Sequence, residues 1–159
     1  MVLGWVLDFA TSDGLYHGFG RRVVPPPLPL YILPPMPKTV LVVDDEPSFS
    51  QLIGEALTEV GYTVFVANDA ATALRHAELV KPALIVSDIQ MPGFGNGADA
   101  ARAMRATPDL KSTPIIFLSG LDEPSAKRLI AGISGCRFMA KPPTLADFLG
   151  VVKSTIGPP

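Results

Sequence analysis

Residues 38–67 read KTVLVVDDEPSFSQLIGEALTEVGYTVFVA and contain a complete alternation of predicted strand, helix and strand. The two ends of this stretch are short apolar runs rich in β-branched residues, which is typical of strands buried on both faces of a parallel sheet. Between them, apolar residues from Phe49 to Val60 recur at helical spacing and form one amphipathic stripe. The stretch therefore predicts a strand–helix–strand unit with parallel strands.

The same alternation continues to the end of the chain. The predicted strands are the short apolar runs at residues 39–43, 64–67, 83–87, 115–118 and 136–140. Helix starts are marked by Pro47, Asp69, Pro124 and Thr144. Helix ends are marked by Gly61 and Gly135. Five strands that alternate with five helices predict an open α/β fold with right-handed crossovers. We expect a five-stranded parallel sheet, order 2-1-3-4-5, in a flavodoxin-like three-layer sandwich.

The composition of this 159-residue chain excludes several classes of protein. Thirteen Lys and Arg residues against 15 Asp and Glu give a net charge of −2, which offers no basic surface for direct nucleic-acid binding. The longest uncharged stretch, residues 23–37, contains seven prolines, so no membrane-spanning helix is expected there. The single cysteine, Cys136, excludes an internal disulfide and is typical of a reducing compartment. We expect a cytoplasmic protein without membrane insertion.

Residues 1–37 differ in composition from the rest of the chain. They hold seven of the 17 prolines and show no helical or strand period. Prolines at this density favour extended polyproline II geometry, so this segment is expected to be a disordered or loosely packed extension. An alternative is that translation starts at Met36, since MPKTVLVVDDE leads directly into the first strand. Residues 38–157 form the predicted folded domain.

Polar residues follow four predicted strands at the sheet edge where ligands bind in folds of this type. Asp44 and Asp45 follow the first strand, and Asp88 follows the third. Ser119 follows the fourth strand and Lys141 the fifth. In the order 2-1-3-4-5 the first and third strands are neighbours, so the three aspartates are expected to converge. Each of these residues alone is typical of a turn or a solvated surface, and only their joint placement indicates a site.

The predicted carboxylate cluster requires a positive charge. Three carboxylates about 5 Å apart repel by roughly 3 kcal/mol per pair at an effective dielectric constant near 20, and Lys141 supplies a single charge. An open, oxygen-rich site suits a hard cation such as Mg²⁺ or Mn²⁺. Such a metal can bridge to phosphoryl oxygens while Lys141 and Ser119 hold the remaining ones. Asp88, which stands singly, is the better candidate for a nucleophile that carries a phosphoryl group.

Four segments carry a resemblance to a known family. They are VLVVDDE (40–46), LIVSDIQMPG (84–93), IIFLSG (115–120) and FMAKP (138–142). In this order and spacing they resemble the receiver domains of two-component response regulators, of the CheY-like single-domain type. The resemblance covers roughly residues 38–157.

The resemblance implies a role for each residue of the predicted site. Asp88 would accept a phosphoryl group from a phosphohistidine on a sensor histidine kinase or a histidine phosphotransfer protein. Ser119 and Lys141 would contact that group, and Phe138 would turn inward as Ser119 moves toward the phosphate. The implied ligands of Mg²⁺ are Asp45, Asp88, the backbone carbonyl of Gln90 and, through water, Asp44. The Lys141–Pro142 peptide is expected to be cis.

The resemblance also implies a signalling switch whose chemistry is limited to its own phosphorylation and dephosphorylation, rather than an enzyme with other substrates. Because the chain ends soon after the fifth predicted helix, we expect output through an unknown protein partner. The expected partner surface is formed by the fourth helix, the fifth strand and the fifth helix. The expected state is a monomer or a weak dimer that depends on phosphorylation.

Two alternative functions stay open. The loop from Asp88 to Gly97 is one residue longer than is usual in the family, and Pro143 replaces a usual aromatic. Both departures would suit a pseudo-receiver, a protein-interaction module without phosphorylation. A haloacid-dehalogenase-type phosphatase also uses strand-end aspartates and Mg²⁺, but needs Asp-x-Asp where Asp44 and Asp45 are adjacent. A GFGNGA segment at residues 93–98 resembles a dinucleotide-binding motif, but follows the third strand rather than the first.

Overall fold

The computed structural model describes residues 36–91 and 96–159, which form five strands alternating with five helices. The strands are β1 (Thr39–Val43), β2 (Thr63–Ala67), β3 (Leu84–Asp88), β4 (Ile115–Ser119) and β5 (Cys136–Ala140). The helices are α1 (Pro47–Glu59), α2 (Ala70–Val80), α3 (Gly97–Ala106), α4 (Glu123–Leu129) and α5 (Leu145–Ile156). All neighbouring strands are parallel, in the order β2-β1-β3-β4-β5. The predicted fold class and strand order are confirmed.

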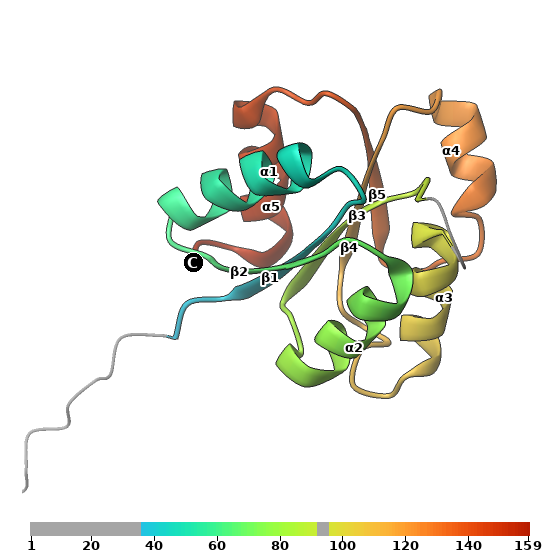
Figure 1. The fold of residues 1–159 in the computed structure, drawn as a ribbon, viewed down its shortest axis with the longest axis horizontal. Coiled ribbons are helices and arrows are strands. Elements are labelled where there is room, and N and C mark those ends of the chain that lie inside the picture. Colours follow the sequence, from blue (N-terminus) through green and yellow to red (C-terminus); the bar gives the residue numbers. More distant parts are fainter. Residues whose placement is uncertain (1–35, 92–95) are drawn as a thin grey trace, which may run out of the picture. The chain divides into compact units, whose positions relative to one another are not determined.

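Helices cover both faces of the sheet, with α1 and α5 on one side and α2 and α3 on the other (Figure 1). Successive side chains of a strand point to opposite faces, so each strand contributes to two cores. Val40, Val42 and Phe148 belong to the core beneath α1 and α5. Phe117 and Met104 belong to the other core, which also includes residues of α2 and α4. This alternation decides which strand-end side chains meet.

Most helices begin at a side chain that satisfies free backbone N–H groups. Asp69, Asp122 and Thr144 each accept a hydrogen bond from the backbone three residues ahead. Asn96 and Asp99 form a reciprocal capping box at the start of α3. No side chain caps α1, whose first residue is Pro47. These residues fix the helix starts close to the predicted positions.

The end of α4 differs from the sequence-based expectation. Apolar residues at positions 126, 129, 130 and 133 recur at helical spacing and predict a helix that ends near Gly135, but α4 ends at Leu129. Gly132 has a φ of 78°, a left-handed conformation that a right-handed helix cannot include. Ile130 and Ile133 are still buried in the core shared with α2 and α3. The spacing of the apolar residues therefore predicts their burial correctly, but not the end of the helix.

The C-terminal helix packs normally despite Pro143. Phe148 and Val152 of α5 are fully buried against the sheet. The Lys141–Pro142 peptide is cis, as the resemblance implies. No helix within the described ranges is both long enough and apolar enough to cross a membrane. The predictions for residues 1–35 and for the first half of GFGNGA, residues 93–95, lie outside the described residues.

Candidate functional site

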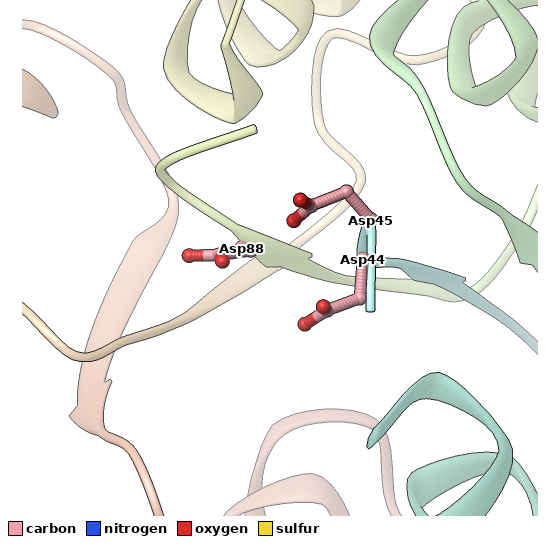
Figure 2. A group of neighbouring side chains, drawn as sticks. All are labelled: Asp44, Asp45 and Asp88. Atoms are coloured by element: carbon pink, nitrogen blue, oxygen red, sulfur yellow. The ribbon is translucent and has the colours of Figure 1, made fainter. Parts of the chain in front are cut away.

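Strand geometry brings the three predicted aspartates to one edge of the sheet. Val43 of β1 is aligned with Ser87 of β3, so Asp44 and Asp88, which follow them, come from neighbouring strand ends. Asp44 lies two residues beyond Val42 and therefore projects to the α1 and α5 side, whereas Asp45 projects to the opposite side. Figure 2 shows the carboxylates of Asp44 and Asp45 on opposite sides of their strand, with Asp88 beside them.

The three carboxylates form a group that fits a metal ion. One oxygen from each of Asp44, Asp45 and Asp88 lies within 4.8 Å of the others. Asp44 is almost fully buried, and Asp45 is exposed. An arrangement of carboxylate oxygens that is open to solvent on one side suits a hard, partly hydrated cation such as Mg²⁺.

Lys141 supplies a positive charge to this cluster. Its Nζ lies 2.5 Å from Asp44 Oδ2 and 3.0 Å from Asp88 Oδ2, and its side chain is 17% exposed. The backbone N–H of Lys141 donates to the carbonyl of Ser119 at 2.9 Å, which ties the residue to the end of β4. With one ammonium among three carboxylates, two negative charges in the cluster stay uncompensated by Lys141.

The electrostatic consequence differs for the two sides of this ion pair. Burial raises the pKa of Asp44, and its hydrogen bonds to Lys141 and to the backbone N–H of Glu46 offset that rise only in part. For Lys141, burial lowers the pKa, but Asp44 and Asp88 together raise it above its usual value. Two carboxylate partners outweigh the burial of Lys141, so the lysine is held charged. A single shared ammonium does not outweigh the burial of Asp44, so the charged form of this carboxyl is disfavoured in the folded protein.

We expect Asp44→Asn to raise the free energy of unfolding of the metal-free protein at pH 7. The folded-state pKa of Asp44 lies above its usual value of 3.8, so stability is lost as pH rises through the folded pKa. The asparagine variant cannot ionise, so its advantage should shrink as pH falls toward 3.8 and below. Urea denaturation at several pH values measures this. Asp109→Asn is the control, because Lys81 lowers the pKa of that exposed carboxyl. Lower stability of Asp44→Asn at pH 7 would contradict the prediction.

Ser119 and Phe138 lie on one side of the sheet, and the ion pairs of Lys141 with Asp44 and Asp88 lie on the other. Ser119 lies two residues beyond Phe117, whose β5 partner is Phe138, and both phenylalanines pack in or against the core beneath α2, α3 and α4. Ser119 is fully buried, and its hydroxyl accepts a 3.4 Å hydrogen bond from the backbone N–H of Leu121. In the described part of the chain, that hydroxyl makes no hydrogen bond to the aspartate cluster or to Lys141.

Gln90 lies beside the cluster and is exposed. Its backbone N–H donates to Asp88 Oδ1 at 3.2 Å, which orients the Asp88 carboxylate. The backbone of Gln90 therefore lies beside the Asp88 carboxylate, with which its carbonyl is predicted to bind Mg²⁺.

Sequence reasoning missed three residues that shape the site. The side chain of Asn68 donates to the backbone carbonyl of Asp44 at 2.9 Å and so links the ends of β2 and β1. The sequence places Phe49 in the apolar stripe of its helix, but the Lys141 ammonium lies 4.4 Å from the centre of its ring. Gly97 lies against the backbone of Asp88. The position of Asn68 at a strand end is a signal that the sequence offered, whereas the contacts of Phe49 and Gly97 are tertiary.

The sequence of this domain matches a known protein family. Residues 40–153 match the family model of the response regulator receiver domain. The chain belongs to this family. The receiver domain therefore accounts for the sheet, the helices and the acidic edge described above, and receiver domains bind Mg²⁺ at such an acidic pocket.

Individual relatives agree with the family assignment. The chain is 36% identical over 107 residues to the alkaline phosphatase synthesis transcriptional regulatory protein PhoP of Bacillus subtilis, covering 67% of this chain and 43% of PhoP. It is 34% identical over 106 residues to the CAI-1 autoinducer sensor kinase/phosphatase CqsS of Vibrio cholerae, covering 66% of this chain and 15% of CqsS. The matched part is thus less than half the length of these curated relatives.

Solved receiver structures have the same fold. Chemotaxis protein CheY4 of Vibrio cholerae superposes with a TM-score of 0.71 at 28% identity, over 76% of this chain and 99% of CheY4. The receiver domain of sensor histidine kinase PA1611 of Pseudomonas aeruginosa gives a TM-score of 0.68 at 29% identity, over 77% and 99% of the two chains. The PA1611 structure holds a magnesium ion coordinated in its active site cleft.

Proposed function

We propose that this receiver domain is a phosphate-accepting switch in which Asp88 takes up a phosphoryl group in a Mg²⁺-dependent reaction. One observation carries the proposal: the Asp88 carboxylate belongs both to the acidic cluster and to the ion pair with Lys141. One oxygen of Asp88 is therefore placed beside a fixed ammonium, and the carboxylate also borders a cation site. A phosphoryl group on Asp88 would meet positive charge from both.

Each residue of the proposed site would have a role that follows from its position. Asp45, Asp88 and the backbone carbonyl of Gln90 would hold Mg²⁺, with Asp44 acting through water. Bound Mg²⁺ would neutralise charge on the carboxylates and on phosphoryl oxygens. Lys141 would stabilise the developing negative charge from the α1 and α5 side. Ser119 would donate its hydroxyl proton to a phosphoryl oxygen, since its only role in the bond to the Leu121 N–H is that of acceptor, and Phe138 shares its side of the sheet.

The transfer step conserves atoms and electrons. A carboxylate oxygen of Asp88 attacks phosphorus, an O–P bond forms, and the N–P bond of a donor phosphohistidine breaks. The electron pair of that bond stays with the imidazole nitrogen, which takes a proton. Dephosphorylation reverses the state of Asp88: a water oxygen attacks phosphorus, the bond to Asp88 breaks, and inorganic phosphate leaves.

Incubation of the protein with acetyl phosphate and Mg²⁺ tests the proposal. We expect a hydroxylamine-labile phosphoryl group on Asp88 that forms only when the metal is present. No label under these conditions would contradict the proposal and favour the pseudo-receiver alternative. Turnover of a generic phosphate ester would instead favour a haloacid-dehalogenase-type phosphatase.

We expect Mg²⁺ to stabilise the wild-type protein, because it relieves repulsion among the carboxylates. At a concentration about ten times the dissociation constant, the gain is about 1.4 kcal/mol. Asp45→Asn should lose most of this gain, whereas Glu59→Gln on the exposed end of α1 should keep it. Urea denaturation with and without Mg²⁺ measures the effect. An equal gain for wild type and Asp45→Asn would place the ion elsewhere.

The proposed phosphate donor is a sensor histidine kinase or a histidine phosphotransfer protein. Receiver domains interact with histidine kinases, and the relatives include receivers of sensor kinases. The proposed output surface consists of α4, β5 and α5, because Phe138 of β5 would turn inward as Ser119 moves toward the phosphate. The proposed oligomeric state is a monomer, or a weak dimer that depends on phosphorylation. The phosphorylated protein would bind an unknown protein partner.

A further inference from the structure

We propose that the aromatic ring of Phe49 positions Lys141 for phosphorylation of Asp88. The inference rests on the proposed function, because it assigns a further residue to the same site. Phe49 does not touch Asp88 or the metal site in this proposal, and acts only by holding the lysine ammonium in place. It is therefore a positioning residue rather than a catalytic one.

The contact follows from how α1 and β5 meet. Phe49 is the third residue of α1, whose start is fixed by Pro47 directly after the acidic strand end. Lys141 lies two residues beyond Met139, which packs against the core beneath α1 and α5, so its side chain projects toward α1. The two side chains meet there, with Lys141 Nζ 4.4 Å from the centre of the Phe49 ring. A cation over the face of an aromatic ring at this distance is attracted by the ring's negative electrostatic face.

The ring offers something that the carboxylates cannot. Asp44 and Asp88 attract Lys141 in the metal-free protein, at 2.5 and 3.0 Å. A divalent cation in the acidic cluster would neutralise the two uncompensated charges and weaken that attraction just when the phosphoryl group must be bound. A divalent cation does not compete for the ring of Phe49. The ring therefore keeps the ammonium beside Asp88 between metal binding and phosphoryl transfer.

Packing alone is the competing explanation of Phe49. The side chain is half-buried and packs against the core that includes Phe148 and Val152. Phe49→Leu preserves an apolar side chain and removes the ring face, whereas Phe49→Tyr preserves the ring. A residue needed only for packing would not make these two variants differ in the chemistry of Lys141.

The rate of phosphorylation by acetyl phosphate with Mg²⁺ tests the proposal in folded variants. We expect Phe49→Leu to react about threefold to tenfold more slowly than wild type, and Phe49→Tyr to react at close to the wild-type rate. Phe65→Leu is the control, because Phe65 is a partly exposed aromatic on the edge strand β2. A wild-type rate for Phe49→Leu, or equal slowing of Phe49→Leu and Phe49→Tyr, would overturn the proposal.

A second measurement needs no phosphorylation. The ε-methylene protons of Lys141 in the metal-free wild-type protein should show an upfield NMR shift from the ring current of Phe49. Phe49→Leu should abolish that shift, while Phe49→Tyr and Phe65→Leu should retain it. Absence of the shift in wild type would overturn the positioning role. A wild-type protein that shows the shift but takes no phosphoryl group would contradict the proposed function and leave the Phe49–Lys141 contact in place.

Discussion

Replacement of Asp88 by asparagine is expected to reduce Mg²⁺-dependent phosphorylation by about a hundredfold or more. The amide keeps the shape of the side chain but has no carboxylate oxygen to form the acyl phosphate. The neighbouring acids are poorly placed to replace it: Asp44 is buried against Lys141, and Asp45 projects to the other side of its strand. Reaction with acetyl phosphate, followed by borohydride reduction and peptide mass spectrometry, measures both the extent and the position of labelling.

The matched control for this experiment is Asp109→Asn. Asp109 is an exposed aspartate paired with Lys81 on the surface, so its loss removes one carboxylate without touching the acidic cluster. This variant should be labelled at the wild-type rate. Labelling of Asp88→Asn at a rate similar to the control would show that another side chain is the acceptor.

Replacement of Gly97 by alanine is expected to lower the free energy of unfolding by about 2 kcal/mol or more. A Cβ atom at this position would lie 1.7 Å from the backbone oxygen of Asp88 and 2.7 Å from Ser87 Oγ. Backbone atoms cannot turn aside as a flexible side chain can, so either α3 or the end of β3 must move. Because β3 ends at Asp88, the same shift should weaken Mg²⁺ binding. Urea denaturation and Mg²⁺ titration measure the two effects.

Gly54→Ala is the control for the loss of a glycine. A Cβ atom there would meet only Val64 and Val66 side chains at 3.6 and 4.0 Å, which are ordinary contacts. Because Gly54 lies inside α1, alanine should stabilise the protein by about 0.5–1 kcal/mol. If Gly97→Ala were as stable as Gly54→Ala, the close approach of α3 to Asp88 would not be a constraint on the sequence.

The sequence was sufficient for the sheet and for the residues at its acidic edge because both depend on local patterns. Apolar runs predicted five strands, and polar residues directly after those runs predicted which side chains share the edge. Parallel pairing then brings Asp44, Asp45, Asp88 and Lys141 together, since neighbouring strands end side by side. The opposite orientations of Asp44 and Asp45 also follow from strand alternation.

Other features depend on tertiary contacts that no local pattern records. Ile130 and Ile133 are buried and keep the helical spacing of apolar residues, although α4 ends at Leu129 and Gly132 beyond it is left-handed. Phe49 fits a core stripe equally well whether or not a lysine lies over its ring. The need for glycine at position 97 comes from the backbone of another element, and the bond from the Leu121 N–H to Ser119 is set by the turn after β4.

A crystal structure of the protein with beryllofluoride and Mg²⁺ tests the central claim most directly, because beryllofluoride imitates a phosphoryl group on a carboxylate. We predict beryllium bonded to an oxygen of Asp88 and Mg²⁺ bound by Asp45, Asp88 and the carbonyl of Gln90. Lys141 and Ser119 should face the fluorine atoms. Beryllofluoride bound away from Asp88, or Mg²⁺ absent from the three carboxylates, would contradict the account.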